Sequence, residues 1–216
     1  MKFKVCCVRS VAEAEAAIAA GAWAIGLVAA MPSGPGPISD TDIRAIAGAT
    51  RDRARRFLLT ARTDAKAIIA HVRFCNTDSV QLVDATTPAA RAAIRQACPG
   101  VIIVQVVHVC DQGSIARARA AAQHSDMVLL DSGRPDGPVK ELGGTGRTHD
   151  WVISARIVKA LACPVLLAGG LNPGNAAAAA HAVRPFALDV CSGLRNEAFV
   201  LDSEKLHAFA NTLNIP

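Results

Sequence analysis

The chain has 216 residues, of which 51% are hydrophobic and 19% are charged, and its formal net charge is +5. This composition excludes a disordered chain, and the length allows one domain with a sizeable core, so we expect a single domain over residues 1–216. The seven cysteines have no regular spacing, which argues against a disulfide framework and predicts a reducing, cytoplasmic location.

The positive charges are scattered along the chain. Their densest group spans residues 51–56, and no aromatic residue stands between its arginines. We therefore interpret it as a solvated loop and expect no nucleic-acid partner. No apolar run is long enough to span a membrane, and no cysteine and histidine spacing is typical of a zinc site. We therefore expect neither a membrane partner nor a bound metal.

Strand-like and helix-like segments alternate along the chain. The strand-like segments are mostly continuous aliphatic runs without polar alternation, which is typical of strands covered on both faces in a parallel sheet. They occupy residues 3–8, 24–29, 56–60, 79–83, 102–107, 127–130, 165–168 and 187–190. The helix-like segments occupy residues 11–20, 41–47, 64–73, 88–97, 114–123, 152–161, 175–183 and 203–213. Several follow residues that favour N-caps, namely Ser10, Ser39, Thr87 and Asp202.

This alternation predicts an α/β fold with a single (β/α)8 barrel. A doubly wound open sheet is the alternative, but no Gly-x-Gly-x-x-Gly follows the first strand. The connections over residues 30–38 and 131–150 are unusually long, and both follow the end of a strand. Such barrels place their chemistry on that face, so we expect binding loops there.

The last two predicted strands end in small residues. Gly169 and Gly170 follow one strand, and Ser192 and Gly193 follow the other, each with a helix-forming stretch behind it. Small residues let the backbone approach an anion closely, and amides at a helix start favour negative charge. These two segments therefore predict a phosphate site and a phosphorylated small-molecule ligand.

Two other strand ends carry groups suited to proton transfer. Cys6 closes the first strand, where a stabilised thiolate can act as a base, although cysteine is also a common small core residue. Asp131 closes the sixth strand, where a loop-capping role is the alternative. Strand alternation predicts that Cys7 points the opposite way from Cys6, against the helices.

Taken together, these segments resemble the phosphoribosylanthranilate isomerase family along the whole chain. The resemblance is most specific in the second half. It rests on Lys4-Val-Cys6, Leu129-Leu-Asp-Ser132, Gly143-Gly-Thr-Gly-x-x-x-Asp-Trp151, Ala168-Gly-Gly-Leu-Asn-Pro-x-Asn175, Asp189-Val-x-Ser-Gly193 and Asp202-x-x-Lys205-x-x-x-Phe209.

The resemblance implies a cofactor-free Amadori rearrangement in tryptophan biosynthesis, in which an N-linked phosphoribosylamine becomes a 1-amino-1-deoxyketose phosphate. It implies that Asp131 is the general acid that opens the ribose ring and that Cys6 is the general base that removes the C2 proton. The implied phosphate-binding residues are Gly144, Gly146, Gly169, Gly170, Ser192 and Gly193. The expected substrate-binding residues are Lys4, Gln81 and Asp189, together with Arg9 and Arg195, which stand where the family pattern has other residues. We expect a monomer or a homodimer.

The sequence departs from the family pattern where the aromatic group of the substrate is expected. Gly36 stands nearest the place of the arginine that would grip the anthranilate carboxylate. Arg9 or Arg195 is a candidate replacement, and pairing with surface acids is the alternative. We interpret His149 as a packing residue and His108 as structural or exposed. A paralogue acting on another phosphoribosylamine or sugar phosphate, or a non-catalytic phosphometabolite-binding barrel, remains the alternative function.

Overall fold

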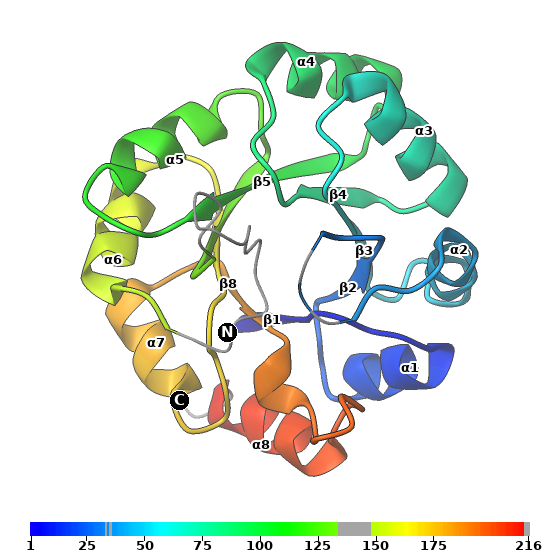
Figure 1. Cartoon of the computed structure of the whole chain (residues 1–216). Coiled ribbons are helices and arrows are strands. Elements are labelled where there is room, and N and C mark those ends of the chain that lie inside the picture. Colours follow the sequence, from blue (N-terminus) through cyan, green and yellow to red (C-terminus); the bar gives the residue numbers. More distant parts are fainter. Residues whose placement is uncertain (33, 35, 134–147, 214–216) are drawn as a thin grey trace.

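The computed structural model describes residues 1–32, 34, 36–133 and 148–213. Eight parallel strands form a closed barrel in sequence order, and helices surround it (Figure 1). Because β1 pairs with β8, the sheet has no open edge, so the (β/α)8 barrel is confirmed and the open sheet is excluded. The strands are β1 (Lys2–Val5), β2 (Ala24–Val28), β3 (Arg55–Thr60), β4 (Ser79–Leu82), β5 (Ile102–His108), β6 (Met127–Asp131), β7 (Val165–Leu167) and β8 (Ala187–Val190).

The helices lie outside the strands, in the layer visible in Figure 1. They are α1 (Val11–Ala19), α2 (Asp40–Ala49), α3 (Ala65–Cys75), α4 (Pro88–Ala97), α5 (Ser114–Ala122), α6 (Trp151–Ala160), α7 (Ala176–Val183) and α8 (Ser203–Leu213), with a short 3-10 helix η1 (Ser192–Leu194) after β8. The predicted caps are confirmed, since Ser10, Ser39 and Thr87 each accept a hydrogen bond from the amide three residues on. Asp202 likewise accepts from the amides at the start of α8.

The core has two apolar layers, because successive side chains of a strand point to opposite faces. In β3, Phe57 and Leu59 belong to the cluster inside the barrel, whereas Leu58 belongs to the cluster between strands and helices. Trp23, just before β2, packs edge-on against Phe57 and Phe186, with ring centroids 5.8 and 5.3 Å apart. These rings cover the N-terminal end of the barrel interior, which leaves the C-terminal ends of the strands for chemistry.

The first strand ends earlier than the sequence predicts, at Val5 and not at residue 8. Cys7 adopts a positive φ of 61°, which breaks the alternation of an extended strand. As a result Cys6 and Cys7 both join the apolar cluster inside the barrel. The prediction that Cys7 packs against the helices is therefore wrong.

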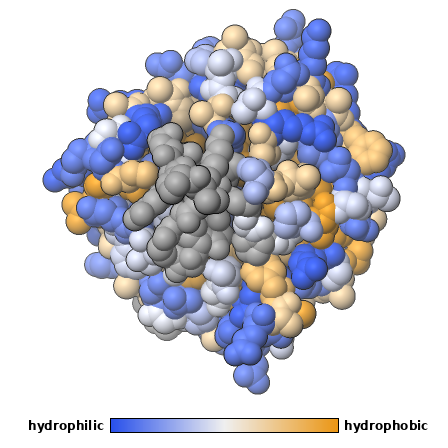
Figure 2. Space-filling model, in the orientation of Figure 1, coloured by the Kyte–Doolittle hydropathy of each residue, from blue (hydrophilic) through white to orange (hydrophobic). Residues whose placement is uncertain are grey.

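Polar and apolar residues are interspersed on the face of the molecule that Figure 2 shows. None of the helices within the described ranges is long and apolar enough to cross a membrane.

Candidate active site at the barrel mouth

A buried ion pair joins β1 and β8 inside the barrel. Lys4 Nζ donates to Asp189 Oδ2 at 2.8 Å, and the two side chains are 0% and 5% exposed. Burial raises the pKa of Asp189 to about 7, against the opposing effect of the Lys4 charge. Burial alone would lower the pKa of Lys4, but Asp189 and the nearby thiols raise it above its usual value. Lys4 therefore stays a buried cation beneath Cys6.

Cys6 lies directly above this pair, at the end of β1. Hydrogen bonds from the thiols of Cys191 and Cys7, with a further contribution from the Lys4 charge, hold its pKa well below the ordinary cysteine value. Hydrogen bonds with Cys191 and Cys6 raise the pKa of Cys7, and the hydrogen bond with Cys6 raises the pKa of Cys191, so both of these thiols keep their protons. A thiol with a lowered pKa is present to a greater extent as thiolate at neutral pH. Because the thiolate is the form that accepts a proton, Cys6 is suited to act as a general base.

The space around Cys6 depends on a glycine in the neighbouring strand. A Cβ placed on Gly26 would lie 2.8 Å from Cys6 Sγ and 3.0 Å from Lys4 Nζ. Any other residue at this position would displace the thiol or the ammonium group. Neither Gly26 nor Cys191 is marked in the sequence, because Gly26 lies within an aliphatic strand and Cys191 stands at the unspecified position of the Asp189–Gly193 segment.

Asp131 ends β6 on the same face of the barrel. Desolvation raises the pKa of its carboxyl group, although the Ser132 amide donates to Oδ1 at 2.7 Å and opposes the shift. A negative charge on Cys6 raises this pKa further, and a positive charge on His108 lowers it. Asp131 is thus biased towards its protonated form, while its neighbour Cys6 is biased towards the deprotonated one.

His108 is a further functional candidate that the sequence alone did not reveal. It ends β5, is 9% exposed and stands opposite Asp131 in the register of β5 and β6. In the sequence it has no neighbouring motif, and only the strand pairing brings it beside the carboxyl group. Of the two interpretations of His108, structural or exposed, its burial excludes exposure.

The predicted phosphate residues after β7 and β8 lie against each other. Gly169 and Gly170 have φ values of 86° and 62°, a conformation that favours glycine. A Cβ on Gly193 would lie 2.0 Å from the Leu171 carbonyl oxygen, so the two loops touch through their backbones. Within the described ranges, the amides of Gly169, Gly170, Ser192 and Gly193 donate no hydrogen bond, which leaves them available for an anion. Gly144 and Gly146 lie outside the described residues.

His149 contacts the same loops. Its Nε2 is 2.8 Å from Ser154 Oγ, and a Cβ on Gly169 would lie 3.0 Å from its Nδ1. Burial lowers the pKa of His149 to about 4, so the ring is neutral at physiological pH. These contacts agree with the predicted packing role.

The two arginines proposed as carboxylate clamps have different surroundings. Arg195 is 4% exposed, pairs with Glu13 Oε1 at 2.8 Å and donates to the carbonyls of Cys6 and Cys7 at 3.0 and 2.7 Å. Its guanidinium therefore holds the end of β1 in place. Arg9 has an exposed side chain, and its backbone amide donates to Glu13. Of the two, only Arg9 has a side chain that faces solvent.

Gly36 fills the place where the family pattern has an arginine. Its φ is 89°, and a Cβ there would lie 2.8 Å from Cys7 Cβ. A side chain at this position would require the loop to move. The backbone course at this position therefore excludes an arginine. The turn at Cys7 can approach the loop this closely only because residue 36 is a glycine.

Gln81 is buried on β4, with a side chain that points into the barrel interior. It is 4% exposed, and its Oε1 makes no hydrogen bond within the part of the chain that is described. A buried amide oxygen without a partner is unfavourable, so this atom is a natural acceptor for a ligand hydroxyl. Its substrate-binding role stays a prediction.

The sequence predicts no bound metal, and this stays a prediction, but three side chains of the kind that ligate metals lie together in the fold. Asp40, His71 and Cys75, which no short motif links, lie together between α2 and α3, away from Cys6 and Asp131. Folding alone assembles this group, so spacing in the sequence gives no sign of it.

The chain is similar to known proteins over almost its whole length. A family model described as "PRAI: N-(5'phosphoribosyl)anthranilate (PRA) isomerase" matches residues 3–212. A protein of Methanocella arvoryzae named N-(5'-phosphoribosyl)anthranilate isomerase is 31% identical, over 99% of this chain and 98% of its own length. One of the same name from Natronomonas pharaonis is 33% identical, over 97% and 96%. The crystal structure of phosphoribosyl anthranilate isomerase from Thermus thermophilus has a TM-score of 0.83 at 25% identity, and the match covers 99% of this chain and 98% of that one.

Proposed function

This chain belongs to the N-(5'-phosphoribosyl)anthranilate isomerase family, and we propose that it converts a phosphoribosylamine into a 1-amino-1-deoxyketose phosphate by acid–base catalysis. The preferred substrate is phosphoribosylanthranilate, which the names of the relatives specify. The reaction moves hydrogen as protons only, so it needs no redox cofactor.

One observation carries the assignment of roles, namely the opposite pKa shifts of two neighbouring groups. The pKa of Cys6 is lowered by its thiol neighbours, and that of Asp131 is raised by desolvation. Titratable groups whose pKa values are pushed apart in this way identify an acid and a base in one site. These shifts support Asp131 as the acid and Cys6 as the base.

In the proposed first step Asp131 donates its proton to the ribose ring oxygen, and the bond from that oxygen to C1 breaks. The electron pair on nitrogen forms a Schiff base with C1. The Cys6 thiolate then removes the proton from C2, and the resulting enolamine tautomerises to the ketone. Asp131 has lost one proton and Cys6 has gained one, so a net transfer from the thiol to the carboxylate, through solvent or product, resets the site.

Lys4 and Asp189 support the proposed base, Cys6. The Lys4 ammonium group stabilises the Cys6 thiolate, and Asp189 keeps that lysine charged and fixed. Asp189 Oδ1 is buried without a hydrogen-bond partner among the described residues, so it is free to accept from a sugar hydroxyl or from the substrate amine. We assign Lys4 to positioning and Asp189 to both positioning and substrate binding.

We place the phosphate group at the free amides after β7 and β8. Gly169, Gly170, Ser192 and Gly193 offer these donors, and the tight approach of Gly193 to the neighbouring loop fixes their spacing. Backbone amides that point at one place make an anion site without a charged side chain. A crystal soaked in phosphate tests the assignment, because an empty pocket with phosphate bound elsewhere contradicts it.

A second candidate substrate carries a group other than anthranilate on the same phosphoribosylamine. The observation that favours it is Gly36, whose backbone conformation and contact with Cys7 leave no room for the expected arginine. Arg195 is held by Glu13 and two carbonyls, so it is not free to replace that arginine unless these contacts open.

The decisive experiment is a fluorescence assay of the purified chain on phosphoribosylanthranilate, together with complementation of a tryptophan auxotroph that lacks this isomerase. Turnover and growth support the preferred substrate. Turnover of another phosphoribosylamine, with none on phosphoribosylanthranilate, supports the paralogue. Binding of phosphorylated ligands without turnover of any supports a non-catalytic barrel and contradicts the proposal.

Assembly and location stay predictions, namely a monomer or homodimer in the cytoplasm. A neighbouring structure from Thermotoga maritima, 23% identical, is described as that of monomers made from a dimeric isomerase, which concerns that protein. Sedimentation of the purified chain measures its own state.

A further inference from the structure

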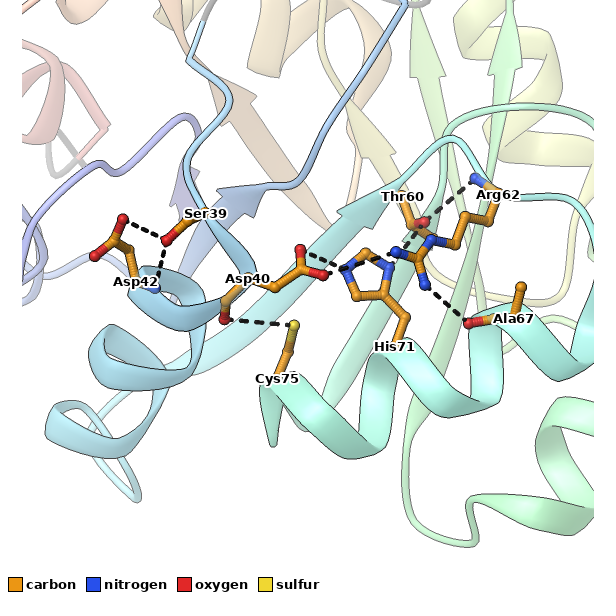
Figure 3. A network of polar contacts seen from close by, with 8 residues as sticks. All are labelled: Ser39, Asp40, Asp42, Thr60, Arg62, Ala67, His71 and Cys75. Atoms are coloured by element: carbon orange, nitrogen blue, oxygen red, sulfur yellow. Dashed lines mark hydrogen bonds and ion pairs between the residues drawn. The ribbon is translucent and has the colours of Figure 1, made fainter.

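A second group of ionisable side chains lies between α2 and α3 (Figure 3), and it includes neither the proposed acid nor the proposed base. It consists of Asp40, His71 and Cys75, whose ligand atoms all lie within 4.8 Å of one another. We propose that these three residues bind a divalent transition metal of the zinc class. Neither the family comparison nor the proposed reaction assigns any role to them.

The secondary structure presents the three side chains to one point. His71 and Cys75 are four residues apart on α3, so their side chains leave the same face of the helix. Asp40 is the first residue of α2 and projects towards that face (Figure 3). Tetrahedral zinc needs ligand atoms roughly 3.3–3.8 Å apart, given metal–ligand bonds of about 2.0–2.3 Å. A contraction of about 1 Å from the widest present spacing is sufficient, which is within the range of small side-chain rotations.

The existing hydrogen bonds already orient the ligands. His71 Nε2 is 2.9 Å from Asp40 Oδ1, and a metal would replace the proton between them. The other ring nitrogen, Nδ1, lies 3.2 Å from Thr60 Oγ1. A ligating histidine generally uses its second nitrogen in this way, because the contact fixes the ring and selects the tautomer. The contact with Thr60 thus orients the imidazole ring of His71 for binding a metal.

Burial and charge suit a metal with one open coordination position. The side chains of His71 and Asp40 are 1% and 36% exposed, and Cys75 is fully buried, so the site is closed on the protein side and open at the carboxylate. One thiolate and one carboxylate neutralise a divalent cation, and the imidazole adds no charge. A sulfur, nitrogen and oxygen donor set favours zinc over magnesium or calcium.

Arg62 is the nearby cation that opposes this binding. Its guanidinium lies 3.7 Å from Asp40 Oδ2, the oxygen that does not contact His71, and it also donates to the Ala67 carbonyl. Because it holds the second carboxylate oxygen, it can stay in place while the first oxygen binds metal. Its positive charge should nevertheless weaken the affinity, which gives the proposal a second, directional test.

A hydroxyl nucleophile activated by His71 and Asp40 is a different interpretation of the same contacts. The position of Thr60 argues against it, because its side chain points away from the barrel interior and the residue is only 1% exposed. Its hydroxyl also accepts from the Arg62 amide at 3.3 Å. No substrate reaches a hydroxyl that is covered in this way.

A metal here would fasten two helices and the loop before them. Asp40 directly follows the connection between β2 and α2, which contains Gly36. Near the end of this connection, the Ile38 amide donates to the Val28 carbonyl. Binding would tie the end of this connection to α3. The expected consequence is greater stability, with no part in proton transfer.

The test uses the full-length chain after treatment with a chelator. Cobalt(II) serves as the spectroscopic probe, since a thiolate ligand gives a charge-transfer band that free cobalt lacks. We expect one equivalent of cobalt to produce this band and zinc to displace it. Zinc should also raise the Tm of the wild-type chain by several degrees, because it binds the folded state alone.

Matched variants identify the ligands. Cys75→Ala should abolish the charge-transfer band and the zinc-dependent Tm shift, whereas Cys98→Ala, which removes another buried thiol at a helix end, should keep both. Asp40→Asn should weaken cobalt binding at least tenfold. Arg62→Gln should strengthen it, by about three- to tenfold, since it removes a nearby positive charge.

Three outcomes overturn the proposal. One is wild-type protein that shows neither the band nor the Tm shift. Another is a band that survives in Cys75→Ala but is lost in Cys6→Ser, which would place cobalt on the thiols of the barrel mouth. The third needs no variant, namely a zinc-soaked crystal whose anomalous peak lies elsewhere than between Asp40, His71 and Cys75.

Discussion

The barrel mouth has two parts, one formed by backbone amides and the other by buried ionisable side chains. The phosphate part, after β7 and β8, consists of backbone amides held by glycines, with Gly193 pressed against the Leu171 carbonyl. The acid–base part, at the ends of β1 and β6, consists of buried side chains whose proton affinities depend on one another, as those of Cys6 and Asp131 do. The first part therefore depends on shape and the second on charge, and the two should fail in different ways when altered.

The largest effect is expected from the charged part. Cys6→Ala and Asp131→Ala should each lower kcat by about 10²–10⁴-fold, the usual contribution of a general acid or base. Steady-state kinetics measure the loss, and unchanged circular dichroism shows that the fold persists. A loss below tenfold in either variant would remove that residue from the proposed mechanism.

A smaller effect, and mainly on binding, is expected from the backbone part. Gly193→Ala places a Cβ where the Leu171 carbonyl stands, so the loops must separate and the amides lose their alignment. We expect KM to rise by about tenfold or more, with a loss of roughly 1–3 kcal/mol in the free energy of unfolding. Kinetics and urea titration measure the two quantities.

Gly48→Ala is the matched control for that substitution. Gly48 lies within α2, and a Cβ there meets nothing within 4 Å. Because alanine is a better helix former than glycine, this variant should be more stable, by about 0.5–1 kcal/mol, with KM unchanged. If both glycine variants behave alike, the close approach of the two loops does not govern phosphate binding.

Substitution of the thiols around Cys6 tests whether they act through the pKa of Cys6 or only by filling space. Cys7→Ala and Cys191→Ala each remove a hydrogen bond that lowers the pKa of Cys6, so the pKa of Cys6 should rise. Less thiolate is then present at neutral pH, and the limb of the kcat/KM profile on its acidic side should move to higher pH. A pH–rate profile that does not move in either variant would show that these thiols only fill space.

The smallest effect concerns the anthranilate carboxylate. With Gly36 in the arginine position and Arg195 held by Glu13, the described part of the barrel mouth has no buried cation free to grip this group. We expect less than about tenfold preference in kcat/KM for phosphoribosylanthranilate over the aniline analogue, because a charge-assisted hydrogen bond would give about ten- to a hundredfold or more. A larger preference that Arg9→Ala removes would assign the clamp to Arg9.

Periodicity and composition were sufficient to predict the fold, and the reason is physical. Strands covered on both faces need continuous aliphatic runs, and each helix needs a cap such as Ser10 or Thr87, so these features appear in the sequence. The glycines at Gly169 and Gly170 were visible for the same reason, because positive φ values favour that residue. A structural requirement that a residue meets within its own segment is therefore visible in the sequence of that segment.

The contacts that tune the site were not predictable, because they join segments far apart in the chain. Cys191 contacts Cys6 only through the pairing of β8 with β1, and His108 meets Asp131 only through the register of β5 and β6. The left-handed turn at Cys7 was also missed, since nothing in the sequence marks a cysteine for that conformation. Closure of the barrel, and not local propensity, creates these neighbours.

The most direct test of this account is the titration of Cys6 by thiolate absorbance, as the difference between wild-type protein and Cys6→Ser. The hydrogen bonds from Cys191 and Cys7 and the charge of Lys4 predict that the first thiolate to form belongs to Cys6, at a pH well below the usual cysteine pKa of about 8.5. The acidic limb of kcat/KM should follow the same curve. A Cys6 that titrates at or above the usual value, with activity independent of its protonation, would contradict the account.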